Sequence, residues 1–74
     1  MELPREVAVV GAGTMGAGIA HVFAEAGCSV RLCARRATSL EAARPRLGGH
    51  AVELTTSAED ALTGAGLVVE TIAE

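Results

Sequence analysis

Aromatic residues are nearly absent from this chain of 74 residues: Phe23 is the only one, and there is no Trp or Tyr. Any core must therefore be packed from Val, Leu, Ile and Ala. Half of the residues are apolar, which excludes a chain that is disordered by composition. A core of this size is marginal because small domains bury a small part of their surface, so we expect at most one domain, and an incomplete one.

Lysine is absent, and all six basic residues are arginines in a chain of net charge −3. Without a basic run or stripe, nucleic acid is not an expected partner. Only two cysteines occur, Cys28 and Cys33, which are too few for a disulfide framework or a zinc site. We therefore expect two small free thiols and no metal, and a reducing, cytoplasmic location suits them.

One stretch without Asp, Glu, Lys or Arg, residues 7–24, reaches the length of a membrane-spanning helix. Four glycines interrupt it, and it contains His21. Its first part has the pattern of a strand and its second part that of a helix, and no signal-peptide pattern accompanies it. The sequence therefore predicts no membrane partner.

Strand and helix patterns alternate along the chain. A β-branched run at residues 5–10 predicts a buried strand, and helical spacing of Met15, Ile19, Val22, Phe23 and Ala26 predicts a helix over residues 14–26 that ends at Gly27. Further strands are predicted at residues 29–33, 51–54 and 67–72, the last beside the first strand.

Two further helices are predicted between these strands. The spacing of Thr38 and Glu41 indicates a capping box and a helix that begins near Ser39 and stops at Pro45 and the following glycines. Ser57 is predicted to cap a helix that runs to about Leu62. This alternation predicts an α/β fold, a three-layer α/β/α arrangement with a parallel sheet of about four strands.

Gly11-x-Gly13-x-x-Gly16 is the most informative motif, because it follows a strand and opens a helix. Gly11 permits a tight turn, Gly13 lets a diphosphate approach the backbone, and Gly16 lets the helix lie close to the strand. The pattern predicts a partial Rossmann fold whose loop amides and helix dipole bind the phosphates of a dinucleotide. The predicted binding residues of the turn are Gly11, Ala12, Gly13, Thr14, Met15 and Gly16. The alternative is a closely packed strand-turn-helix without a ligand.

The end of the second predicted strand should select the cofactor. An acidic residue there would bind the ribose hydroxyls of NAD, but the sequence has Ala34 followed by Arg35 and Arg36. Loss of the acid beside arginines accommodates a 2′-phosphate, so these residues favour NADP. The alternative is that both arginines belong to a solvated strand end.

Four other polar residues are candidates for a role. His21 is predicted to be a surface histidine on the helix face opposite Ile19, not a catalytic base. Glu74 is expected to line the cleft beyond the carboxyl ends of the strands and to contact the cofactor, whereas Glu70 is expected to be structural. His50 falls in a predicted loop with no identifiable partner. No catalytic residue is predicted.

The segment VAVVGAGTMGAGIAHVFAEAGCSVRL (residues 7–32) resembles the opening of the 3-hydroxyacyl-CoA dehydrogenase NAD-binding domain, and residues 54–74 resemble its segment leading into the fourth strand. The resemblance implies the N-terminal part of an NAD-binding domain over residues 1–74, without the catalytic remainder and the C-terminal helical domain. It implies hydride transfer between NAD and a 3-hydroxyacyl-CoA or related 3-hydroxy acid, a role in fatty acid metabolism, and a homodimer when full length.

Two departures from the family leave other functions open. The family usually has an acid at the position of Ala34, and its helical stretch after the second strand is usually longer. We therefore expect an oxidoreductase only as part of a full-length NAD(P)-dependent enzyme, with no activity of this fragment alone. The alternatives are a non-catalytic dinucleotide-binding module and an inactive truncated fragment.

Overall fold

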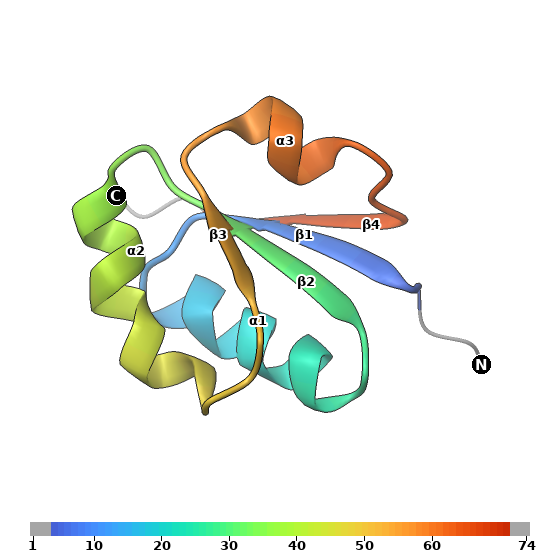
Figure 1. The fold of residues 1–74 in the computed structure, drawn as a ribbon, viewed down its shortest axis with the longest axis horizontal. Helices are drawn as coiled ribbons and strands as arrows, with labels where there is room; N and C mark the ends of the chain where they lie inside the picture. Colours follow the sequence, from blue (N-terminus) through green and yellow to red (C-terminus); the bar gives the residue numbers. More distant parts are fainter. Residues whose placement is uncertain (1–3, 72–74) are drawn as a thin grey trace.

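The computed structural model describes residues 4–71, which form a single parallel sheet with helices on both faces (Figure 1). The elements in chain order are β1 (Glu6–Val10), α1 (Thr14–Glu25), β2 (Ser29–Cys33), α2 (Ala37–Ala43), the 3₁₀ helix η1 (Arg44–Leu47), β3 (Glu53–Thr55), α3 (Ala58–Leu62) and β4 (Leu67–Glu70).

The four strands are parallel and lie in the order β3-β2-β1-β4. Val9 of β1 is aligned with Leu32 of β2 on one side and with Val69 of β4 on the other. The predicted position of the last strand beside the first is thus confirmed. Residues 7–9 are fully buried, as expected for a central strand that is covered on both faces.

Two helical layers enclose the sheet. Helices α1 and α2 lie together on one face and α3 lies alone on the other (Figure 1). The larger core lies between the sheet and the first two helices and is lined by Val7, Val9, Ala17, Ala20, Val30, Leu32, Leu40, Ala43 and Leu47. Among the described residues, the core on the α3 side contains Ala8, Cys33 and Ala61, with Ala65 packed against it. The predicted three-layer α/β/α fold is therefore confirmed.

Helix α1 packs mainly through its small residues, and of the predicted apolar face only Ile19 and Phe23 are partly buried against the core. Gly16, Ala17 and Ala20 are buried, whereas Met15 and Val22 are 70% and 60% exposed. Small side chains bring the helix axis close to the sheet, and they leave the larger residues on neighbouring faces of the helix. The prediction that Met15 and Val22 share the buried face is wrong for this reason.

Helix α2 begins two residues earlier than predicted, and the capping box does not form. Arg36 occupies the N-cap position, and no side chain caps the helix. The carboxylate of Glu41 instead accepts bonds from Arg44, at 3.2 Å from Nε and 3.0 Å from Nη2. Pro45 lies in the first turn of η1, so the chain continues as a 3₁₀ helix where the sequence predicted an end.

The remaining boundaries lie close to those predicted. Gly27 follows α1 with a φ of 98°, and β3 is displaced by one or two residues from the predicted range. The predicted cap of α3 is confirmed, because the Ser57 hydroxyl accepts a 3.1 Å hydrogen bond from the Asp60 amide. The end of the last predicted strand at Ile72 lies outside the described residues.

The uncharged stretch of residues 7–24 is divided between β1, the glycine turn and α1. Within residues 4–71, none of the helices has both the length and the apolar character that crossing a bilayer requires.

Candidate functional site

A cleft of about 860 Å³ opens at the edge of the sheet where the strands end. Because all four strands are parallel, the segments that follow β1, β2, β3 and β4 meet at this edge, which is where open α/β sheets bind ligands. The lining residues are Val10, Gly11, Ala12, Gly13, Thr14, Cys33, Ala34, Arg35, Arg36, Ser39, Ala42, Arg46, Thr56, Ala58, Glu70 and Thr71.

Gly11 forms the turn out of β1 and has no room for a side chain. Its φ is 113°, a conformation that L-residues rarely adopt, and a Cβ there would overlap the carbonyl oxygen of Thr71. Its amide donates a 2.8 Å hydrogen bond to the carbonyl of Cys33 at the end of β2. The turn is thus tied to the two strands that flank β1.

Gly16 brings the first turn of α1 against the same strand end. A Cβ at this position would overlap the carbonyl oxygen of Gly11 and would lie 2.7 Å from the Thr71 hydroxyl oxygen. That hydroxyl contacts the carbonyl oxygens of Val10 and Gly11 at 3.3 and 3.2 Å, so it can donate to either. Gly16 and Thr71 together fix where α1 begins relative to the end of β1.

The N-terminus of α1 faces the cleft without a side-chain cap. Gly13 is the N-cap residue, with extended backbone angles and no side chain that could accept from the helix amides. The first turn of an α-helix has N–H groups without intrahelical partners, and the helix dipole makes this end positive. Gly13 and Thr14 line the cleft, so these donors are available to an anion.

Three arginines surround the part of the cleft beyond β2. Arg35 and Arg36 follow Ala34 and are exposed, and Arg46 of η1 lines the same space. Among the described residues none of the three forms an ion pair, so their charge is directed to solvent and to the cleft. Arg46 could not be identified from the sequence, because its position depends on η1 continuing from the end of α2.

Glu70 and Thr71 line the cleft on the side of β4. Glu70 is exposed and is the last residue of β4, so it lies at the cleft and not inside the strand as predicted. Glu74, which was predicted to line the cleft, lies outside the described residues. Met15 and Gly16 of the predicted turn adjoin the cleft in sequence but are not among its lining residues.

The two cysteines are free, as predicted. Cys33 is buried at the end of β2, where burial raises the pKa of its thiol. Cys28 is half-buried, and its Sγ donates to the carbonyl of Pro4 at 3.2 Å. The raised pKa keeps Cys33 as a neutral thiol beside the cleft.

His21 is half-buried, and the prediction of a surface histidine is wrong. Its helix packs against η1, and the segment after η1 brings His50 to 5.1 Å between ring centroids. His50 therefore has a partner that the sequence did not reveal. Within residues 4–71 no histidine lines the cleft.

A known family matches residues 6–53, from β1 to the start of β3: the 3-hydroxyacyl-CoA dehydrogenase NAD-binding domain. This chain belongs to that family. The match includes the glycine turn, α1 and the arginines after β2, and it confirms the resemblance drawn from the sequence.

Two curated relatives are dehydrogenases with different substrates. Glycerol-3-phosphate dehydrogenase [NAD(P)+] of Corynebacterium jeikeium is 45% identical over 74 residues, covering 86% of this chain and 22% of the relative. L-aspartate dehydrogenase of Brucella anthropi is 39% identical over 70 residues, covering 95% of this chain and 26% of the relative. The chain thus spans about a quarter of the length of the curated relatives it matches.

Solved structures share the fold. A 5-formyl-3-hydroxy-2-methylpyridine 4-carboxylic acid 5-dehydrogenase, described as an NAD+ dependent dismutase, superposes with a TM-score of 0.85 at 29% identity, covering 97% of this chain and 29% of that chain. An imine reductase from Pseudomonas sp. gives a TM-score of 0.72 at 24% identity, covering 92% of this chain and 22% of that chain. These structures support a Rossmann-type sheet.

Proposed function

We propose that this chain binds the diphosphate of a nicotinamide dinucleotide at Gly11–Gly13 and the first turn of α1. The observation that carries the proposal is the uncapped helix N-terminus at the glycine turn, which faces the cleft at the carboxyl edge of the sheet. Gly11 and Gly16 leave no space for a Cβ, so this close approach of turn, helix and strand depends on glycine.

We further propose that the cofactor is NADP, with its 2′-phosphate between Arg35, Arg36 and Arg46. Ala34 supplies no carboxylate for a ribose hydroxyl, and arginine binds phosphate through paired N–H donors. The three side chains carry no competing ion pair within the described part of the chain. Family membership by itself favours NAD, and a direct comparison of the two cofactors distinguishes the two assignments.

A titration with NADPH and with NADH tests this cofactor preference. The chain has no Trp or Tyr, so nicotinamide fluorescence can be followed without emission from those residues. We expect NADPH to bind about tenfold more tightly, which corresponds to about 1.4 kcal/mol for charged hydrogen bonds weakened by solvent. Replacing Arg35, Arg36 and Arg46 by Ala should remove this preference and leave the affinity for NADH unchanged.

The matched control for that titration is Arg5→Ala, an exposed arginine that does not line the cleft. This variant should keep the preference for NADPH. A wild-type chain that binds NADH as tightly as NADPH would show that Arg35 and Arg36 are a solvated strand end.

The whole protein is proposed to be an NAD(P)-dependent oxidoreductase of the 3-hydroxyacyl-CoA dehydrogenase type that acts in the cytoplasm. Family membership supports a 3-hydroxyacyl-CoA or a related 3-hydroxy acid as substrate. The curated relatives are named for glycerol 3-phosphate and for aspartate, although both match most of this chain. The part that they share with this chain therefore does not determine the substrate class.

The 74 residues by themselves should bind the cofactor without catalysing hydride transfer. No histidine among the described residues lines the cleft, and a general base must reach the substrate. Incubation of the purified chain with acetoacetyl-CoA and NADPH or NADH should therefore give no oxidation of the cofactor. Turnover that survives purification and scales with chain concentration would contradict this assignment.

A further inference from the structure

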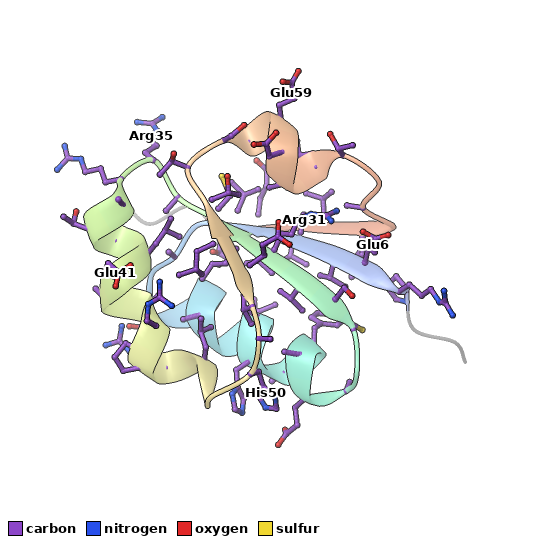
Figure 2. The ribbon with its side chains drawn as sticks, viewed as in Figure 1. Glu6, Arg31, Arg35, Glu41, His50 and Glu59 are labelled. Atoms are coloured by element: carbon purple, nitrogen blue, oxygen red, sulfur yellow. The ribbon has the colours of Figure 1, made fainter. Side chains whose placement is uncertain are left out.

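His21, Glu25 and His50 form a cluster outside the cleft. One side-chain ligand atom of each residue lies within 4.8 Å of the other two. His21 and Glu25 are one turn apart on α1, and His50 comes from the segment after η1. Figure 2 shows His50 below α1, well away from Arg35 in the segment between β2 and α2.

The buried Nδ1 atom of His21 lacks a hydrogen-bond partner among the described residues. Buried ring nitrogens are normally paired, so an unpaired one calls for an explanation such as an ion or a water molecule. Gly48 closes on this ring so tightly that a Cβ there would overlap Cε1 and lie 2.5 Å from Nδ1.

The donor set of this cluster is suited to a transition metal. Two imidazole nitrogens and one carboxylate oxygen are ligands that Zn²⁺ prefers, with a fourth position left for water. Mg²⁺ and Ca²⁺ select oxygen ligands and would not use two histidines. Zinc–ligand bonds of about 2.0–2.2 Å require the three ligand atoms to move to within about 3.3 Å of each other. The exposed Glu25 and half-buried His50 have room to make this movement.

We propose that His21, Glu25 and His50 bind one divalent zinc ion that joins α1 to the segment between η1 and β3. The ion would hold the end of α1 against the crossover that links β2 to β3. Bound metals commonly stabilise domains whose core is small. Since none of the three residues lines the cleft, the metal should raise stability and leave dinucleotide affinity unchanged.

The test is a Zn²⁺ titration of the full chain against a chromogenic chelator, with the urea midpoint measured in parallel. We expect one equivalent of zinc per chain and a higher midpoint when zinc is present, since a ligand that binds only the folded state stabilises it. His50→Gln and Glu25→Gln should each weaken zinc binding by about tenfold or more. Glu25 is exposed, so that variant should fold even if His50→Gln does not.

Two control variants separate this site from other ligands. Glu59→Gln removes an exposed carboxylate on α3, and Cys28→Ser removes the more accessible thiol, so both should bind zinc as the wild type does. Co²⁺ as a second probe should give the absorption of a nitrogen and oxygen site without thiolate charge-transfer bands. Absence of stoichiometric zinc binding, equal affinity of Glu25→Gln, or loss of binding in Cys28→Ser would each overturn the proposal.

Discussion

Replacing Gly16 by Ala tests whether the close contact between α1 and the end of β1 holds the glycine turn together. The added Cβ would overlap the carbonyl oxygen of Gly11, which is backbone and cannot rotate away. Overpacking of this kind typically costs about 1–3 kcal/mol. Alanine occurs at this third position in some dinucleotide-binding turns, so it is not excluded by the motif itself. The expected loss of stability therefore comes from the contact between Gly16 and the Gly11 carbonyl in this protein.

Gly18→Ala is the matched control on the same helix. A Cβ at Gly18 meets no atom within 4 Å, and alanine is more favourable than glycine in a helix by about 0.5–1 kcal/mol. The difference between the two variants therefore isolates the overlap at Gly16. We expect Gly16→Ala to have a free energy of unfolding about 1–3 kcal/mol below that of Gly18→Ala.

Urea titrations followed by far-ultraviolet circular dichroism at 25 °C measure this difference, because the slope with denaturant should be the same for both variants. Gly16→Ala should also bind NADPH more weakly, since the turn has to move to admit the methyl group. Equal stability of the two variants would refute the reasoning that the α1–β1 contact requires glycine at position 16.

Three further predictions concern side chains outside the turn. Arg31→Met should lower the free energy of unfolding by about 2 kcal/mol in urea titrations. The Arg31 guanidinium donates 2.8 Å hydrogen bonds to two carbonyls of the α3 segment and pairs with a glutamate of β1 at 2.9 Å. A change below about 0.5 kcal/mol would contradict this prediction. Iodoacetamide at pH 8 should alkylate Cys28 before Cys33, since burial raises the pKa of the Cys33 thiol; mass spectrometry showing the reverse order would contradict it. Arg44 holds the pKa of the Glu41 carboxyl below its ordinary value. The pair therefore stabilises the fold at pH values above the unfolded pKa of about 4.3. This contribution is lost as the pH falls through the lower pKa of the folded state. An NMR titration of Glu41 should show a raised pKa in Arg44→Ala, and an unchanged one would disprove the pairing.

The sheet and the glycine turn could be predicted from the sequence because their signals are local. The run of residues 7–10 has the apolar pattern of a doubly covered strand, and Gly11, Gly13 and Gly16 have a spacing that a strand-turn-helix requires. Ser57 was identified as a cap because its partner amide lies three residues away.

The parts of the cleft that depend on register or on tertiary contact could not be predicted. Thr71 reaches the turn because β4 pairs with β1 so that Val10 lies opposite Glu70, and no local pattern sets that register. Helical periodicity placed Val22 in the core, whereas close packing on the sheet selected Ala17 and Ala20 instead.

The pairing of His21 with His50 had no signal in the sequence either. It depends on η1 continuing past Pro45 and on a left-handed conformation at Gly48, where the sequence indicated only the end of a helix. A histidine in a helix and another in a loop are brought together by the path of the chain between them, which spacing alone does not determine.

The most direct test of the central claim is an NMR titration of the ¹⁵N-labelled chain with NADPH and, separately, with inorganic pyrophosphate. If backbone amides at the glycine turn bind the diphosphate, both ligands should shift the amide signals of Ala12, Gly13 and Thr14 first and most strongly. NADPH alone should also shift the signals of Arg35 and Arg36. Saturable binding of NADPH that leaves the amides of residues 12–14 unchanged would contradict the account.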